Sequence, residues 1–397
     1  MFHIETTGVP IRSWIPEEEI EPGALTQMMN LSNHPHAKIA VVALPDIHQG
    51  YGPPIGSVFA LNNHICPSGV GYDIGCGMCA FRTNINISEL DTDTLKSIMG
   101  EIRNRVPMGL GGRREKQHCS IDEHFDMPTL PMWGAPIAEK HYEDAKEQLG
   151  TLGSGNHFIE IQNGDDGYVW AMLHSGSRNV GWQIADHYMK VAKELNEKEP
   201  IKINPAWELE TLRVDSEIGQ TYIAEMGWAM RFAHANRNFM STMVKQSISE
   251  FFSDVKFDNE VNIHHNFAHK EYHYGFGTDL WVHRKGATRA WDGMLGIIPG
   301  SQGSYSYIVE GKGNEASFQS CSHGAGRAMS RSKARKLLDL DTEVAKLTEA
   351  NVIHSLRSKK DLDEATSAYK DVVKCIEYQA DLVEVKTTLF TAGVLKG

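Results

Sequence analysis

The stretch DIGCGMC, from Asp73 to Cys79, decides how this chain must be organised. It places the carboxylate of Asp73 three positions before the thiol of Cys76, and a glycine stands on each side of the thiol. The preceding letters GVGY add more glycine, so the segment is predicted to turn rather than to continue as a helix. The result is a tight backbone loop that carries two side chains able to bind a metal ion.

Histidines lie in similar glycine- or asparagine-rich strings further along the chain, and no single string is decisive. The strings are GSGNHF, LHSGSRN, IHHNFAH and CSHGAGR, which contain His157, His174, His264, His265, His269 and His323. Together with the first stretch they indicate one composite site. Because the histidines come from well-separated parts of the sequence, they must converge, which favours a single interwoven domain over residues 1–397.

The pattern of apolar residues predicts an α+β fold, with mixed sheets at the core, helices around them and the active site between. Strands are expected at 11–15, 39–44, 78–87, 157–162 and 168–175, and strand and turn character over 261–310. Helices are expected at 88–106, 138–150 and 181–198, and the segment 207–252 is predicted to be mostly helical. Residues 107–135 are expected to form a loop insertion, and the last ~70 residues to be helical apart from an apolar stretch ending in VLKG.

Net charge and the length of apolar runs exclude some classes of protein. The formal net charge of −12 over 397 residues argues against a generic nucleic-acid coat, but not against an enzyme whose local basic patch binds phosphates. The basic runs 113–114 and 327–336 are candidates for such a patch, although a solvated helix face is the simpler explanation. No apolar run approaches ~18 residues and the first residues lack a secretory pattern, so we expect a cytoplasmic protein with no membrane partner.

The six cysteines are expected to be free thiols, buried residues or metal ligands. Cys76 and Cys79 form a C-x-x-C pair, but no second pair with the spacing of a structural zinc site accompanies it, and a redox pair is also weakly supported. A more economical interpretation makes Cys76 a ligand and Cys79 a core residue of the following strand.

Asp73, Cys76 and three of the histidines could hold two divalent ions, because a thiolate can bridge two metals ~4 Å apart. Mixed carboxylate, thiolate and imidazole ligands favour Mn, Zn, Co or Fe over Mg or Ca. The simpler alternative is that each histidine is a satisfied core or surface residue. For four histidines in similar contexts, that alternative is the weaker one.

Two further strings suggest contacts to phosphate. PGSQGSYSY at 299–307 has backbone N–H groups that could cradle an anion, although by itself it is little more than a flexible loop. In SHGAGRAMSR at 322–331, small neighbours leave the imidazole of His323 accessible. Arg327 and Arg331 are four positions apart and are expected to share a helix face, with a helix N-terminus bearing a surface histidine as the alternative.

The whole chain resembles the RtcB family of RNA ligases. The resemblance is carried, in order, by PDIHQGYG, DIGCGM, GTLGSGNHFIEI, LHSGSR, HHN, RKGA, IIPGS, SHGAGRAMSR, AYKD and the terminal VLKG. It implies an enzyme that joins an RNA 3′-phosphate or 2′,3′-cyclic phosphate to a 5′-hydroxyl, using GTP and Mn²⁺, in tRNA splicing or RNA repair. The resemblance leaves open whether an activating protein partner is needed.

The resemblance also implies roles for particular residues. Asp73, Cys76 and His157 would bind one manganese, and Cys76, His174 and His265 the second, while His323 would become covalently guanylylated. Contacts to the guanosine nucleotide would fall on Asn156, His157, Phe158, Glu160, His265, Asn266, Pro299, Gly300, Ser301, Gln302, Ser306, Gly324, Ala325, Gly326 and Lys396. RNA phosphates would meet Arg178, Lys285 and Arg331. Gln302, Asn179 and Cys79 depart from the usual pattern and leave room for a different RNA target.

The implied mechanism begins with attack of His323 on the α-phosphorus of GTP. The guanylate then passes to the RNA 3′-phosphate, and the 5′-hydroxyl displaces GMP. Because the attacking imidazole must be neutral, guanylylation should fail well below pH ~6.5. Two other functions use the same residues: a binuclear phosphodiesterase without a nucleotide cofactor, which gives no role to His323 or Lys396, and a zinc-stabilised RNA-binding module without catalysis.

Overall fold

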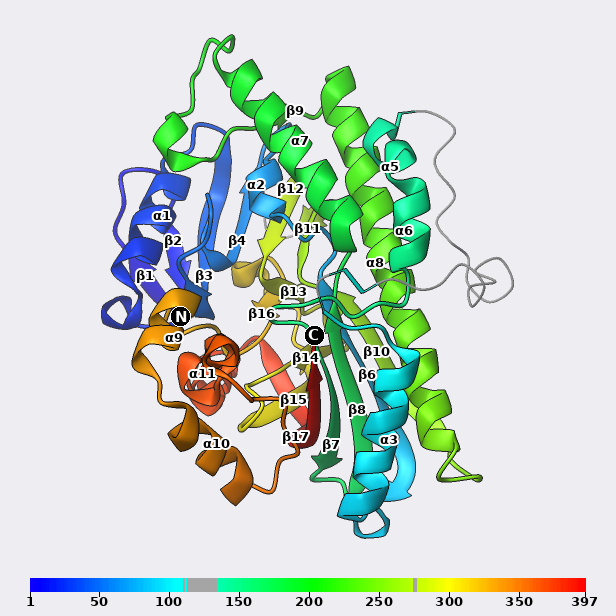
Figure 1. Cartoon of the computed structure of the whole chain (residues 1–397). Helices are drawn as coiled ribbons and strands as arrows, with labels where there is room; N and C mark the ends of the chain where they lie inside the picture. Colours follow the sequence, from blue (N-terminus) through cyan, green and yellow to red (C-terminus); the bar gives the residue numbers. More distant parts are fainter. Residues whose placement is uncertain (110, 113–133, 274–276) are drawn as a thin grey trace.

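Two large β-sheets form the core of the computed structural model, which describes residues 1–109, 111–112, 134–273 and 277–397 (Figure 1). The first sheet has the order β1-β2-β3-β4-β12-β11. Its strands are β1 Phe2–Ile4, β2 Ile11–Ser13, β3 Ala37–His48, β4 Ile55–Leu61, β11 Asn266–His273 and β12 Thr278–Lys285. β2 pairs with β3 in parallel, whereas β3/β4, β4/β12 and β11/β12 are antiparallel, so this sheet is mixed.

The second sheet has seven strands in the order β10-β6-β8-β7-β17-β15-β14. They are β6 Gly77–Asn86, β7 Phe158–Gly164, β8 Tyr168–Ser175, β10 Phe257–His264, β14 Leu295–Ile298, β15 Tyr305–Gly311 and β17 Val383–Lys396. β17 pairs on one side with β7 and on the other with β15. The last residues of the chain therefore lie inside this sheet and next to β7.

Short elements connect the two sheets. The chain passes from β10 of the second sheet to β11 of the first through the single residue His265. β13 Ala287–Arg289 pairs with β16 Ser320–Ser322, and β5 His64–Ile65 pairs with β9 Leu212–Arg213. The end of β10 in the second sheet therefore lies next to the start of β11 in the first.

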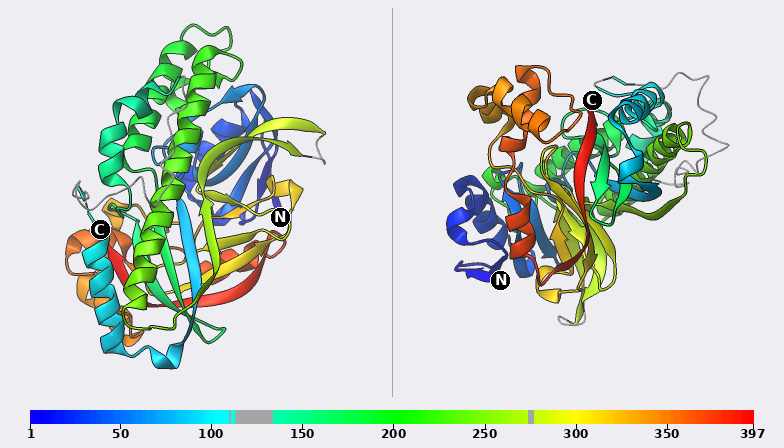
Figure 2. Two further views of the ribbon diagram at one scale, coloured as in Figure 1. Left: turned by 90° about the vertical axis from the view of Figure 1, so that its right-hand side faces the viewer. Right: turned by 90° about the horizontal axis from the view of Figure 1, so that it is seen from below.

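Helices surround the sheets (Figures 1 and 2). They are α1 Pro22–Ser32, α2 Pro67–Val70, α3 Thr92–Arg105, α5 Pro136–Lys140, α6 Tyr142–Gln148, α7 Arg178–Asn196, α8 Glu217–Ser249, α9 Arg331–Leu337, α10 Leu340–Glu349 and α11 Val372–Tyr378. The side chain of Ser216 caps the long helix α8 by accepting from the backbone N–H of Gly219. α8 buries Trp228, Phe232 and Met240 and lies along β6, β8 and β10, which covers one face of the second sheet.

These elements confirm the predicted α+β fold with sheets at the core and helices around them. The first sheet is mixed, as predicted, whereas all pairs of the second are antiparallel. The predicted helical segment 207–252 contains α8, but it begins with a 3₁₀ turn at Pro205–Trp207 and strand β9. The predicted helical end of the chain consists of three short helices and 3₁₀ turns, and its closing apolar stretch is the 14-residue strand β17. None of the helices in the described part of the chain is long and apolar enough to cross a membrane.

One local prediction was wrong. Arg327 and Arg331 do not share a helix face, because α9 begins only at Arg331, where Ser330 caps it. Arg327 instead forms an isolated bridge with Tyr369. Most of the predicted loop insertion 107–135 lies outside the described residues, together with the basic pair 113–114 and Cys119.

Candidate active site

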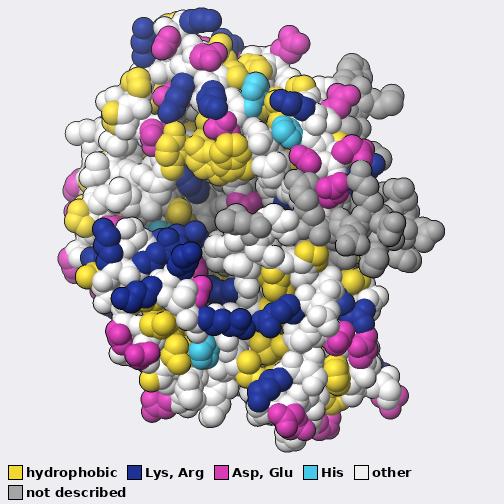
Figure 3. Space-filling view, in the orientation of Figure 1, with side chains coloured by type: hydrophobic (Ala, Val, Ile, Leu, Met, Phe, Trp, Pro, Cys, Tyr) yellow, Lys and Arg dark blue, Asp and Glu magenta, His cyan; other side chains and the backbone are white. Residues whose placement is uncertain are grey.

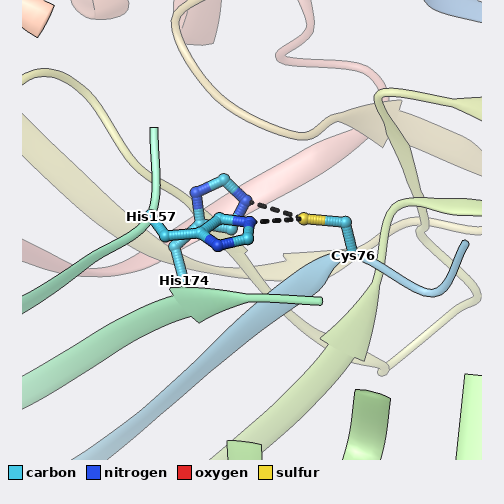
Figure 4. Close-up of side chains that lie close together, drawn as sticks. All are labelled: Cys76, His157 and His174. Carbon is cyan, nitrogen blue, oxygen red and sulfur yellow. Dashed lines mark hydrogen bonds between the residues drawn. The ribbon is translucent and has the colours of Figure 1, made fainter. Parts of the chain in front are cut away.

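Cys76, His157 and His174 form a buried cluster at the strand ends of the second sheet (Figure 4). Cys76 directly precedes β6, His157 directly precedes β7, and His174 lies in β8. The Sγ atom of Cys76 lies 3.2 Å from Nε2 of His174 and 3.6 Å from Nε2 of His157. Since β6 and β7 both pair with β8, the register of the sheet brings the three side chains together.

Backbone carbonyls fix which ring nitrogens face the cluster. Nδ1 of His157 lies 2.9 Å from the carbonyl oxygen of Leu152, and Nδ1 of His174 lies 3.0 Å from that of Asn156. A carbonyl can only accept, so each Nδ1 carries the proton and each Nε2 presents its lone pair to Cys76. Metal-binding histidines are commonly oriented in this way.

Asp73 and His265 extend the cluster at its two ends. Oδ2 of Asp73 lies 3.1 Å from Nε2 of His157, and Nε2 of His265 lies 3.3 Å from Nε2 of His174. The lone pair on Nε2 of His157 faces a carboxylate oxygen, and a proton or a cation must lie between them at this distance. Among the described residues, no partner fixes the tautomer of His265, whose Nε2 either donates to His174 or shares a cation with it. The arrangement therefore fits bound cations.

The ionisation of the cluster agrees with that conclusion. Burial lowers the pKa of His174 and His265 well below the ordinary value, which keeps both imidazoles in the neutral form that binds metals. Burial and the nearby charge of Asp73 raise the pKa of the Cys76 thiol, so a bound cation would be needed to favour the thiolate. Burial alone would raise the pKa of Asp73, but a proton held between it and His157, in the place that a cation would take, and the charge of Arg178 outweigh burial and lower the pKa.

The glycines of the motifs allow these close approaches. A Cβ atom on Gly176 would overlap the carboxylate of Asp73, and one on Gly77 would overlap the carbonyl of Ile263. The backbone N–H of Ser177 donates to Oδ1 of Asp73 over 3.0 Å. The strings DIGCG and HSGS are thus adjacent parts of one packed structure.

His323 lies at the His265 end of the cluster, with ring centroids 4.8 Å apart. Its Nδ1 lies 2.6 Å from Oδ2 of the fully buried Asp46, and its backbone N–H donates to the same oxygen over 3.1 Å. Nδ1 is therefore the protonated nitrogen, and Nε2 keeps its lone pair. The sequence placed Asp46 at the start of a loop but gave it no role.

A cavity of about 370 Å³ opens over His323 and the cluster. The predicted nucleotide residues that line it are Asn156, Phe158, Glu160, His265, Asn266, Pro299, Gly300, Ser301, Gln302, Gly324, Ala325, Gly326 and Lys396. His157 and Ser306 do not line it, although Oγ of Ser306 accepts from the backbone N–H of Gly300. The pairing of β17 with β7 places Lys396 opposite Phe158 and Val394 opposite Glu160, which brings the chain's end into the cavity.

The loop 299–307 is more ordered than its sequence suggests. The N–H of Ser301 donates to Oγ of Ser304 over 2.7 Å, and Nε2 of Gln302 donates to the carbonyl of Glu364 over 2.9 Å. The N–H groups of Gly300 and Ser301 are thus already used within the loop. Burial raises the pKa of Glu160, also in this cavity, to about 7.

The sequence also missed Glu364 and Tyr369, which line the same cavity. Glu364 is buried, and its carboxylate lies 3.2 Å from Nζ of Lys396, 3.3 Å from Nη1 of Arg327 and 3.7 Å from Nη2 of Arg331. The hydroxyl of Tyr369 also donates to it. One buried carboxylate therefore gathers three cations at the cavity wall. Tyr369 stands in AYKD, one of the strings that carry the resemblance, but it was given no role, and no local signal marked Glu364.

The three predicted RNA-phosphate residues lie in two places. Lys285 and Arg331 line the cavity described above, whereas Arg178 lines a neighbouring one. Burial lowers the pKa of Lys285 to about 7. The guanidinium of Arg178 lies against Gly153 and close to Nδ1 of His157.

Other residues singled out in the sequence lie outside the cluster. Nδ1 of His264 donates to the carbonyl of Gly75 over 2.9 Å, and His269 is exposed on β11. Cys79 is buried in β6, as predicted for a core residue. The side-chain amide of Asn266 donates to the carbonyl of Asp73 and accepts from the N–H of Gly286. It therefore connects the loop that begins at Asp73 to the end of β12 in the first sheet.

Comparison with known proteins gives matches over nearly the whole chain. A family model described as tRNA-splicing ligase RtcB matches residues 27–129 and 130–397. The RNA-splicing ligase RtcB of Escherichia coli strain K12 is 35% identical over 411 residues, which cover 99% of each chain. The tRNA-splicing ligase RtcB of Nanoarchaeum equitans is 33% identical over 462 residues, which cover 98% of this chain and 96% of the relative.

Proposed function

Because the chain belongs to the RtcB family, and is therefore an RNA ligase, we propose that it joins RNA 3′-phosphate or 2′,3′-cyclic phosphate ends to 5′-hydroxyl ends. The reaction uses GTP and two Mn²⁺ ions, and it passes through a guanylylated His323. We assign the enzyme to tRNA splicing or RNA repair in the cytoplasm.

One observation carries this proposal. Asp46 accepts from Nδ1 of His323 over 2.6 Å, so in the neutral imidazole the lone pair is on Nε2. That nitrogen stands beside the Cys/His cluster and in the cavity lined by the predicted nucleotide residues. A carboxylate that orients one ring nitrogen and leaves the other toward the reacting atom is an arrangement suited to nucleophilic catalysis by histidine.

His323 acts first. Its Nε2 lone pair attacks the α-phosphorus of GTP, a P–N bond forms, and the bond to the β-phosphate oxygen breaks to release pyrophosphate. An oxygen of the RNA 3′-phosphate then attacks the same phosphorus, the P–N bond breaks, and His323 returns to its starting form. Finally the 5′-hydroxyl attacks the RNA phosphorus, loses its proton, and GMP leaves. A cyclic phosphate is first hydrolysed to the 3′-phosphate by water.

The metal ligands are assigned from the cluster. Asp73, Cys76 and His157 would hold one Mn²⁺, and Cys76, His174 and His265 the other, in agreement with the mixed donors present. When bound, the ions would supply Lewis-acid neutralisation of phosphate charge. Asn156 and Leu152 support this assignment because their carbonyls hold two of the imidazoles in orientation.

The test is covalent labelling with α-labelled GTP and Mn²⁺, measured on the denatured protein. Label is expected on the wild type and not on His323→Ala. His269→Ala changes an exposed histidine of the same chain and should label like the wild type. Label that survives His323→Ala would refute the nucleophile. Phosphodiester cleavage without any label would instead support the binuclear phosphodiesterase.

A further inference from the structure

A second cavity of about 550 Å³ lies next to the first. Tyr72 and Asp73 line both cavities, and Gln148, Arg178, Asn179 and Trp182 belong to the second one. Figure 3 shows a hollow in this face of the molecule, with hydrophobic surface and Lys and Arg side chains around it. The nucleotide assignment gives this second cavity no occupant, and the resemblance assigns only Arg178, in its wall, to an RNA phosphate.

Its wall carries two exposed aromatic rings. Tyr72 is 36% exposed and Trp182 is 45% exposed. Their ring centroids are 6.0 Å apart and their planes differ by 18°, so the rings are stacked. Tyr51 lies behind Tyr72, with ring centroids 5.7 Å apart. Exposed parallel rings of this kind are the surfaces on which single-stranded nucleic acids stack their bases.

The charges around the rings suit a polyanion. Arg178 lines the cavity, and its buried Nε has no hydrogen-bond partner within the described part of the chain. Its guanidinium supplies a positive charge suited to phosphate. Nζ of Lys193 lies 3.0 Å from the hydroxyl of Tyr51. Helix α7 contains two acidic residues, Asp186 and Glu194, and Asp186 is paired with Lys190 over 2.6 Å. These cations can therefore contact the phosphate backbone of an RNA strand whose bases stack on the two rings.

The order of the side chains indicates which RNA strand this cavity serves. The row runs from His323 through His265, His174 and His157 to Asp73. More than half of the predicted nucleotide residues lie in the segments 299–306 and 324–326, which a hydrogen bond from the N–H of Ala325 to the carbonyl of Pro299 joins next to His323. In the proposed last step the 5′-oxygen must approach the phosphorus from the side opposite the departing GMP. That side is the Asp73 end, where the second cavity opens.

We propose that the stacked pair of Tyr72 and Trp182 binds the first bases of the RNA strand that carries the 5′-hydroxyl. This inference rests on the proposed ligation reaction for its direction. Base stacking tolerates any sequence, so the pair would let the enzyme accept 5′ ends of different sequence.

The test uses Trp182→Ala and Trp182→Phe in a ligation assay with a saturating 3′-phosphate RNA and a varied 5′-hydroxyl oligonucleotide. Trp182→Ala is expected to raise the KM for the 5′-hydroxyl strand by about tenfold or more, and Trp182→Phe by much less, because Phe keeps a ring. The KM for the 3′-phosphate strand and the labelling of His323 by GTP should stay at wild-type values. Trp291→Ala removes an exposed tryptophan outside both cavities and is the matched control.

Abasic nucleotides at the 5′ end make the test specific to stacking. They should weaken binding to the wild type but cause no further loss in Trp182→Ala. A higher KM for the 3′-phosphate strand alone would overturn the strand assignment, and unchanged KM values for both strands would overturn the site. If the wild type shows neither label nor ligation, the proposed function fails. Fluorescence polarisation of a 5′-hydroxyl oligonucleotide on wild type and Trp182→Ala would then decide the stacking site separately.

Discussion

Nδ1 of His323 lies 2.6 Å from Oδ2 of Asp46, although the two residues are 277 positions apart in the sequence. Asp46 is held in place from both sides, since Nζ of Lys370 donates to the carbonyls of Pro45 and Ile47. The same carboxylate oxygen accepts from the backbone N–H of His323. The imidazole therefore has one orientation and one neutral tautomer, with Nε2 toward the cavity.

Asp46→Asn should slow guanylylation by about 10²-fold or more, because a neutral amide no longer fixes the tautomer of His323. GTP binding should change little, since Asp46 does not line the cavity. Single-turnover labelling and equilibrium GTP binding separate the two effects. Asp279→Asn, which alters an exposed ion pair with Lys270, serves as the control. Wild-type labelling rates in Asp46→Asn would contradict the orienting role.

Cys76→Ala should abolish both guanylylation and ligation, because the shared ligand of both proposed ions is lost. The metal content after dialysis against Mn²⁺ should fall below two ions per chain, which elemental analysis measures directly. Cys79→Ala removes a thiol three positions away that faces Glu260 instead of the cluster, and it should keep its metal. Two tightly bound ions in Cys76→Ala would disprove the bridge.

Glu364→Gln should weaken GTP binding by about tenfold, because Arg327, Arg331 and Lys396 lose the carboxylate that holds them at the cavity wall. The comparison is Asp363→Asn at the preceding position, whose carboxylate pairs with Arg335 over 2.7 Å. Calorimetric titration with GTP measures both variants. If Glu364→Gln and Asp363→Asn bound GTP with the same affinity, Glu364 would not organise the cations for nucleotide binding.

Glu271 provides a pH-dependent contribution to stability. Burial would raise its pKa, but the charge of Arg284 and hydrogen bonds with His273 and Arg284 outweigh burial and lower it. Because the folded-state pKa lies below the unfolded one, the contribution is complete above pH ~4.3 and is lost as pH falls further. Glu271→Gln leaves the fully buried Arg284 without its ionic partner and should cost roughly 3–5 kcal/mol at pH 7.

Urea unfolding of wild type and Glu271→Gln at pH 7 and at pH 3.5–4 tests this sign. The difference in free energy of unfolding should shrink at the lower pH. Asp215→Asn removes an exposed partner of Arg213 and should have a small effect at both pH values. A difference that is constant with pH would contradict the account.

Local sequence patterns predicted the positions of strands and helices better than they predicted which side chains lie next to each other. Strands β6, β7 and β8 were predicted nearly in full, the first from alternating apolar residues and the other two from short strand-like segments joined by a turn. β7 and β8 are buried on both faces, which is why they appear in the sequence as short apolar runs. The pair Arg327 and Arg331 was misplaced because the helix starts at a cap, Ser330, between them. Spacing alone could not reveal that boundary.

The amino-acid sequence by itself determined which donor atoms are available, a thiol, a carboxylate and several imidazoles, and where glycines leave room for them. Only the tertiary structure decided which of them meet. His264 and His265 are neighbours, yet only His265 joins the cluster, since it occupies the link between β10 and β11. Asp46 and Glu364 reach the site from distant segments. Local pattern sets backbone conformation, whereas distances between remote atoms depend on the register and packing of two whole sheets.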